Sequence, residues 1–108
     1  MNDSTTETMI LEKGLTAPRV TPAMIESKIA KAEFFRLTGT LTVCVLTLAN
    51  GFTVTGESAC ASPENFNEEV GNKIARENAV QKIWPLEGYL LKQYLYDATQ
   101  APAAVAGE

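Results

Sequence analysis

An alternation of β-branched and polar residues fills the middle of the chain, from residue 41 to residue 60, and breaks only at Asn50-Gly51. Asn-Gly is the strongest short-range signal for a β-hairpin, because both residues of a two-residue turn must take positive φ. With such a turn, Val45 pairs with Gly56. This register predicts one core face, formed by Leu41, Val43, Val45, Thr47, Ala49, Phe52, Val54, Gly56, Ser58 and Cys60.

The strand after the turn contains the run Gly56-Glu57-Ser58, whose two small residues lie on the predicted core face. Gly56 and Ser58 would let a helix pack closely against the sheet. Glu57 faces the other way, beside Cys44 and Leu46, on a face that is neither clearly buried nor clearly exposed. A two-stranded ribbon with free edges is marginal in water. We therefore expect a second copy of the chain to extend the sheet or to cover this mixed face.

Helical spacing precedes the hairpin over residues 21–38. Thr21 can cap this helix, and Pro22 suits its first position, where a missing N–H costs nothing. Gly39 is expected to end it. The apolar positions that recur at helical intervals on one face are Ile25, Ile29, Ala32 and Phe35.

Two further helices are predicted after the hairpin. Ser62 and Pro63 indicate the start of the first, which runs to Trp84. Gly71 within it indicates close approach of another backbone or side chain. Pro85 separates it from the last helix. The predicted buried stripes are Phe66, Val70, Ile74 and then Ala79 or Ile83 in the first, and Leu86, Leu90 and Tyr94 in the second.

The predicted fold class is α+β: an N-terminal helix, a two-stranded antiparallel hairpin with an Asn-Gly turn, and two C-terminal helices. These elements form a single domain over residues 21–96. Residues 1–20 and 97–108 lack apolar periodicity and predict a flexible N-terminal tail and a disordered C-terminal tail. A domain of this size is near the lower limit for independent stability, which again favours a homo-oligomer.

Composition and charge exclude several classes of partner. Hydrophobic residues make up 45% of the chain, and its formal net charge is −4. Nucleic acid is not an expected partner, because binding it requires clustered Lys and Arg. No segment reaches the roughly 18 apolar residues of a membrane span, and the N-terminus lacks a secretion signal, so we expect no membrane association. Cys44 and Cys60 face opposite sides in the predicted register, and both should be reduced thiols, as in a cytoplasm.

The sequence offers little for catalysis. It contains no histidine, the usual general base and a common metal ligand, and it lacks a Gly-rich phosphate loop and a nucleophile elbow. We therefore predict that the protein is not an enzyme and has no catalytic residue, metal site or cofactor. Three carboxylates could support hydrolysis or a metal-assisted reaction only if they came together in the fold: Glu57, Glu77 and Glu87. We interpret Glu77 as a surface residue and Glu87 as a partner of the helix dipole.

Cations next to aromatic residues suggest a different role. Lys73, Arg76 and Lys82 lie on one predicted helix, close in sequence to Trp84 and Tyr89. Such a set is typical of sites for a phosphate-bearing ligand that stacks on aromatic rings. We expect the cations to meet phosphates, Trp84 or Tyr89 to stack, and three further residues to form hydrogen bonds: Glu57, Ser58 and Asn78. The alternative is that the aromatic residues belong to the core and the cations to a solvated face.

Three segments together resemble a family of small tailed-phage proteins. They are "TLTVCVLTLANGFTVTGESAC", "GNKIARENAV" and "IWPLEGYLL", and the similarity extends over about residues 21–96. The family is named after gene 49 of one podovirus and gene 66 of another. The resemblance implies a phage origin and expression in the bacterial host cytoplasm. It implies no activity and no site residue.

Three functions remain open from the sequence. The first is an oligomeric phage accessory protein that sequesters nucleotide-like signalling molecules of host defence, by analogy with other small phage proteins. The second is a protein-binding module that inhibits a host enzyme through its acidic surface or a strand edge. The third is a structural or regulatory phage component without a ligand.

Overall fold

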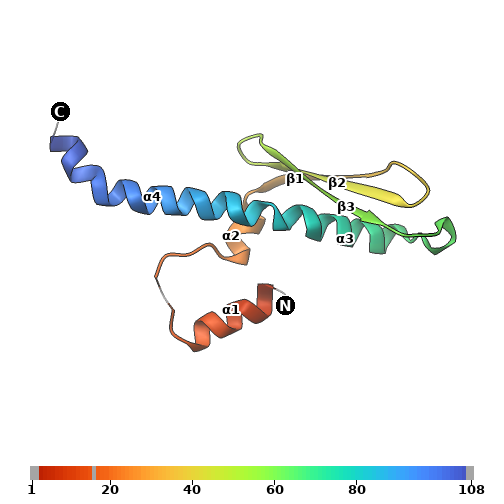
Figure 1. The fold of residues 1–108 in the computed structure, drawn as a ribbon, viewed down its shortest axis with the longest axis horizontal. Helices are drawn as coiled ribbons and strands as arrows, with labels where there is room; N and C mark the ends of the chain where they lie inside the picture. The colour runs from red at the N-terminus through yellow and green to blue at the C-terminus, as the bar shows by residue number, and fades with distance from the viewer. Residues whose placement is uncertain (1–2, 16, 107–108) are drawn as a thin grey trace.

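The computed structural model describes residues 3–15 and 17–106 as an elongated molecule of 65 × 36 × 19 Å. Three antiparallel strands form one sheet in the order β1-β2-β3. Helix α3 lies across the sheet, and α4 continues in nearly the same direction beyond it (Figure 1). The predicted α+β class is confirmed. The elements are α1 (Asp3–Glu12), α2 (Pro22–Ser27), β1 (Ile29–Arg36), β2 (Leu41–Leu48), β3 (Thr53–Ala59), a 3-10 turn η1 (Pro63–Asn65), α3 (Glu68–Gln81) and α4 (Ile83–Ala106).

The first predicted helix is wrong over most of its length. Only Pro22–Ser27 is helical, capped by the Thr21 hydroxyl, which accepts a hydrogen bond from the Met24 amide at 3.2 Å. The chain then becomes strand β1, which pairs antiparallel with β2. The weak helical preference of the β1 sequence is overridden because β2 presents a second row of backbone donors and acceptors that must be satisfied. The sheet therefore has three strands, not the predicted two.

The hairpin between β2 and β3 is confirmed, but its register differs from the prediction by one residue. Within this turn Gly51 takes positive φ, at 91°, and Asn50 does not. The Leu48 amide donates to the Phe52 carbonyl at 2.7 Å, which leaves a three-residue loop. Cys44, not Val45, therefore lies opposite Gly56.

A one-residue shift exchanges the two faces of a strand. Strand β2 buries Thr42, Cys44, Leu46 and Leu48, the side that the sequence assigned to a mixed face. The predicted core face is correct for Val54 and Gly56 of β3. Cys44 and Cys60 consequently belong to the same side of the ribbon, not to opposite sides, and both are free thiols.

Helix α3 crosses the sheet in direct backbone contact with β3. A Cβ atom added to Gly56 would lie 2.8 Å from the Cα of Ala79 and still closer to the Ala79 amide nitrogen and the Ala75 carbonyl oxygen. Ala75 and Ala79 are one helical turn apart and are fully buried. The expectation that Gly56 permits a helix to pack closely is confirmed.

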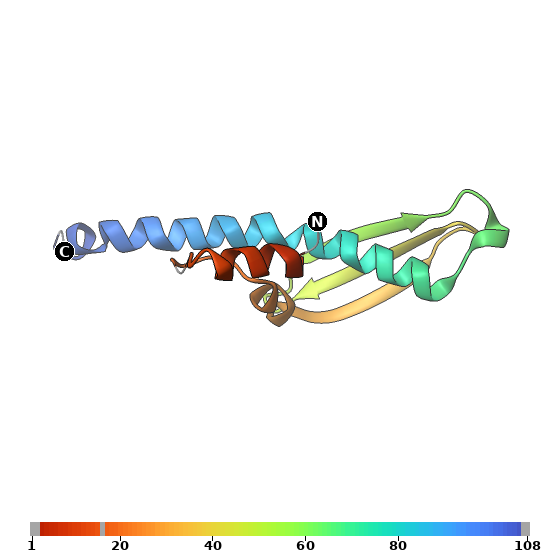
Figure 2. The same cartoon turned by 90° about the horizontal axis from the view of Figure 1, so that it is seen from below.

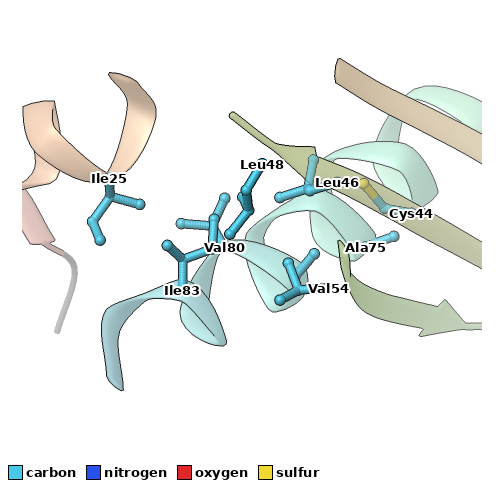
Figure 3. Packing of buried hydrophobic residues seen from close by; sticks show 9 residues of the cluster. Ile25, Cys44, Leu46, Leu48, Val54, Ala75, Val80 and Ile83 are labelled. Atoms are coloured by element: carbon cyan, nitrogen blue, oxygen red, sulfur yellow. The ribbon is translucent and has the colours of Figure 1, made fainter. Parts of the chain in front are cut away.

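Larger side chains fill the core around this contact (Figure 3). They come from one face of the sheet, from α2 and from the junction of α3 with α4. The buried cluster consists of Ile25, Cys44, Leu46, Leu48, Val54, Ala75, Ala79, Val80 and Ile83. The predicted stripe is correct for Ala79 and Ile83 but wrong for Val70 and Ile74, which are exposed, because the side of α3 that faces Gly56 carries Ala75 and Ala79.

The boundaries of the C-terminal helices differ slightly from the prediction. Residue Ser62 precedes only the short turn η1, and α3 begins after Asn67, whose side chain accepts from the Val70 amide at 2.9 Å. The two helices are separated at Lys82, not at Pro85. Pro85 lies in the first turn of α4, where a backbone N–H has no partner within the helix, so its missing N–H costs no hydrogen bond.

The terminal segments predicted to be tails contain helices. Helix α1 occupies part of residues 1–20, and an ion pair between Glu7 and Arg19 connects it to the segment before α2. Helix α4 continues through residues 97–106, which the sequence predicted to be disordered. Figure 2 shows α4 extending beyond the sheet in a second view.

One face of the sheet is left uncovered in the described part of the chain. The described helices lie on one side of the sheet in Figure 1. The other side carries Phe35, which is exposed, and Val43 and Val45, which are half-buried. Phe35 pairs directly with Val43 across the two strands. An apolar sheet face without a cover favours association with another molecule.

Replacing Gly56 with alanine should severely destabilise the fold. The new methyl group would collide with backbone atoms of α3, so we expect the free energy of unfolding to fall by about 3 kcal/mol or more. Urea denaturation followed by circular dichroism measures this change.

Gly88→Ala is the matched control, because nothing lies within 4 Å of a Cβ at this helical glycine. It should stabilise the protein by up to about 1 kcal/mol. Equal stability of Gly56→Ala and the parent protein would contradict the close contact between α3 and β3.

Candidate functional site

The polar residues of α3 that the sequence grouped into one site point in different directions. Lys73 donates to Glu77, one turn later, at 2.9 Å on the exposed side of the helix. Arg76 instead contacts α2, and Asn78 contacts β3. The spacing of Ala75 and Ala79 on the sheet explains this, since side chains at neighbouring positions then project to opposite flanks of the helix.

Arg76 forms a bidentate pair with Glu26 of α2. Its two terminal nitrogens donate to the two carboxylate oxygens at 3.1 and 2.9 Å. The hydrogen bonds from Arg76 lower the pKa of Glu26, and the same bonds raise the pKa of Arg76. This guanidinium therefore connects α2 to α3 and is already neutralised within the chain.

Asn78 has a structural partner on the sheet edge. Its side-chain amide donates to the backbone carbonyl of Glu57 at 2.8 Å. Strand β3 is the last strand of the sheet, so this bond satisfies a carbonyl at an edge. The Glu57 side chain is exposed and pairs in register with Val43, on the uncovered face.

The remaining predicted residues are also separated. Lys82 ends α3 and is exposed, and Trp84 packs partly against the core, with its indole N–H buried and without a partner among the described residues. Tyr89 is 69% exposed on α4. Ser58 lines a hollow at the other end of the sheet. The eight residues therefore do not meet in one site within a single copy.

Tyr89 borders a largely apolar hollow, where the β2–β3 turn meets the start of α4. The hollow has a volume of about 260 Å³. Its lining residues are Leu48, Asn50, Phe52, Leu86, Glu87, Tyr89 and Leu90. A neighbouring recess of about 110 Å³ shares four of these residues and adds Lys28 and Ala49. We call the two together the α4 hollow.

The α4 hollow combines aromatic rings with a buried carboxylate. Phe52 is 55% exposed and Tyr89 is 69% exposed, so both rings are accessible. Glu87 is only 9% exposed, and its nearest cation is Lys28, with 3.8 Å between Nζ and Oε1. Asn50 accepts from the Phe52 amide at 2.9 Å through its side-chain oxygen, which leaves its amide N–H groups available. Stacking surfaces, an acceptor, a donor and a cation thus lie in one place.

The local sequence explains how this hollow forms. The Asn50-Gly51 turn brings Phe52 to the end of the sheet, and the first turns of α4 place Leu86, Glu87 and Leu90 beside this turn. Sequence reasoning found Tyr89 but missed Phe52 and Glu87 as site residues. The signal was the Trp-Pro-Leu-Glu-Gly-Tyr run, whose carboxylate and aromatic ring are two positions apart at a helix start.

Comparison with known families decides the origin of the chain. A model of the Phage protein (N4 Gp49/phage Sf6 gene 66) family matches residues 20–95. The chain belongs to this family. No curated protein and no solved structure matches it.

The match to the phage family covers the elements that build both the sheet and the α4 hollow. It begins just before α2 and ends within α4, so it includes every residue lining the hollow. Helix α1 lies outside it. Among the described residues of this family member, no helix has the length and hydropathy of a membrane span.

The Arg76–Glu26 pair should contribute to stability in a pH-dependent manner. Because the folded-state pKa of Glu26 is lowered, its contribution is complete above the ordinary carboxyl pKa and disappears as the pH falls through the folded value. A double-mutant cycle with Glu26→Gln and Arg76→Gln should give a coupling of about 0.5–1 kcal/mol at neutral pH, as for other partly exposed pairs.

The same cycle at a pH below the lowered, folded-state pKa of Glu26 should give no coupling. A cycle on the more exposed Lys73–Glu77 pair serves as the control and should yield a smaller coupling at neutral pH, about 0.3–0.5 kcal/mol. A coupling between Glu26 and Arg76 that survives in acid would show that the pair is not ionic in origin.

Proposed function

We propose that this phage protein is a non-catalytic binding protein that takes a small, ring-bearing ligand of the nucleotide class into the α4 hollow. The observation that carries the proposal is the placement of Phe52 and Tyr89 around a buried carboxylate. Every nucleobase has a face that stacks on an aromatic ring, so two accessible rings suit such a ligand.

The polar groups of the hollow complement the other parts of a nucleotide. Glu87 accepts hydrogen bonds, as it would from a base amino group or from ribose hydroxyls. Lys28 lies beside it and carries the charge that a phosphate requires. In this assignment Lys28 replaces Lys73 and Arg76 as the cation of the site, because Lys28 lines the hollow and those two do not.

The role that follows is sequestration. A protein that binds a nucleotide-like molecule and lacks histidine for acid–base work would withhold that molecule from the host and leave it chemically unchanged. We place this activity in the bacterial host cytoplasm, where a phage accessory protein would counter defence signalling by nucleotide messengers.

The binding protein acts as a homo-oligomer in this proposal. Leu90 and Tyr94 lie one turn apart on α4 and are both largely exposed, although they form the apolar stripe of that helix. The stripe starts at the hollow, since Leu90 also lines it. A second copy packed along α4 would bury the stripe and close the hollow over its ligand.

A second candidate function is inhibition of a host protein. The uncovered sheet face around Phe35 and Val43 supports it, because exposed apolar patches commonly mark interaction surfaces. A host protein retained by the full chain, and lost on Val43→Glu, would favour this candidate.

Removing the Tyr89 ring should weaken nucleotide binding. Titration calorimetry with a panel of adenine and guanine nucleotides should show affinity falling about tenfold or more in Tyr89→Leu, because base–aromatic stacking is lost. Tyr89→Phe keeps the ring and should bind like the parent protein. Glu87→Gln should also weaken binding, whereas the exposed Glu77→Gln should not. Unchanged affinity in Tyr89→Leu would contradict the assignment of the hollow.

A charge on the α4 stripe should dissociate the oligomer. Sedimentation velocity should show a lower mass for Tyr94→Glu than for the parent protein, because a carboxylate would be buried at the interface. Lys92→Glu changes the charge by a larger amount on another side of the helix and should leave the mass unaltered. Dissociation by both variants would indicate a general charge effect instead.

A further inference from the structure

A second hollow lies at the opposite end of the sheet, between the start of β2, the end of β3 and the chain that leads into α3. Its volume is about 200 Å³. The residues lining it are Thr40, Thr42, Ser58, Ala59, Cys60, Asn65, Phe66, Asn67, Val70, Gly71 and Ile74. None of them lines the α4 hollow, so the two are separate.

Thr42 presents its hydroxyl to this second hollow. The residue is 2% exposed, and among the described residues its side chain makes no hydrogen bond. Its Oγ1 would lie 3.1 Å from a Cβ added to Gly71, so glycine at that position of α3 leaves the hydroxyl uncovered. The predicted close approach at Gly71 is thereby confirmed. The hydroxyl is therefore open to the hollow, where it can donate to and accept from a ligand that enters.

Other neutral polar groups surround this hydroxyl. Ser58 pairs with Thr42 across the two strands, so the two side chains lie next to each other on the same face. The Asn67 side chain uses its oxygen to cap α3, which leaves its amide N–H groups for another partner. Asn65 lines the same hollow.

The charges around this hollow disfavour an anion. No charged residue lines it, although it borders the N-terminus of α3. Glu68 and Glu69 occupy the first turn of that helix and Glu64 lies in η1, so carboxylates already use the positive end of the dipole. The nearby Arg36 is engaged, because its guanidinium lies 3.5 Å from the centre of the Phe66 ring and donates to the Gly39 carbonyl at 2.8 Å.

We propose that this second hollow binds a small, neutral, polyhydroxylated ring of about pentose size. Hydroxyls and amides that can both donate and accept match sugar hydroxyls. The apolar wall of Phe66, Val70 and Ile74 matches the C–H face of a sugar ring. The volume lies below the roughly 300 Å³ at which sites for drug-sized ligands begin, which limits the ligand to a single ring. The site is independent of the α4 hollow.

Cys60 makes the proposal testable in the intact protein. It lines the hollow, is partly exposed and donates from its thiol to the Ser62 carbonyl at 3.3 Å. Cys44 is fully buried, and burial raises the pKa of its thiol, so it should resist alkylation. The rate of Cys60 modification by iodoacetamide, followed by peptide mass mapping, therefore reports on occupancy.

D-ribose should slow alkylation of Cys60 in a saturable manner, and inorganic phosphate should not. In Thr42→Val, which keeps the side-chain shape but removes the hydroxyl, the apparent ribose affinity should fall about tenfold. Thr47→Val, on the uncovered face, should retain the parent affinity. Thr42→Val should also unfold at about the same urea concentration as the parent protein, since among the described residues no hydrogen bond depends on this hydroxyl.

Three results would overturn the proposal. Protection by phosphate without protection by ribose would mean an anion site at the helix start. Ribose protection that is unchanged in Thr42→Val would place the sugar elsewhere. Failure of ribose to protect Cys60 at any concentration would reject a sugar site. None of these results depends on nucleotide binding at Tyr89.

Discussion

The contact between Gly56 and the backbone of α3 is the constraint on which the other features depend. At this point no side chain separates the helix from the sheet, and the facing residues of α3 are Ala75 and Ala79. A side chain of any size on either partner would move the helix outward. The contact therefore fixes the rotation of α3, and the rotation decides which side of the helix each polar residue occupies.

Two consequences follow for the chemistry of the surface. Arg76 is directed to Glu26 on α2 and Asn78 to the edge of β3, so both act in holding elements together. The hollows lie at the two ends of the crossing. One lies where α3 begins and is lined by neutral polar groups, and the other lies where α4 begins and contains two aromatic rings and Glu87. The packing of α3 across the sheet thus leaves one hollow at each end of the helix, and the two hollows differ in their chemistry.

Local signals in the sequence predicted the hairpin, the Thr21-Pro22 helix start and the close packing at Gly56. Strand β1 was missed because its apolar residues recur at helical spacing, and Gly39, which lies in the loop between β1 and β2, was interpreted as the end of a helix. The length of the Asn50-Gly51 loop decided which face of β2 is buried, and the dipeptide alone does not distinguish two residues from three. Tyr89 was found by its aromatic character, whereas Phe52 and Glu87 become neighbours only when the turn meets α4.

Native mass spectrometry of the protein purified from a bacterial lysate, before and after denaturation, tests the proposed sequestration most directly. We predict an oligomer that releases a nucleotide-sized mass on denaturation, and addition of that compound to the refolded protein should restore the bound mass. A monomer without a bound small molecule, to which no nucleotide adds on titration, would contradict the account.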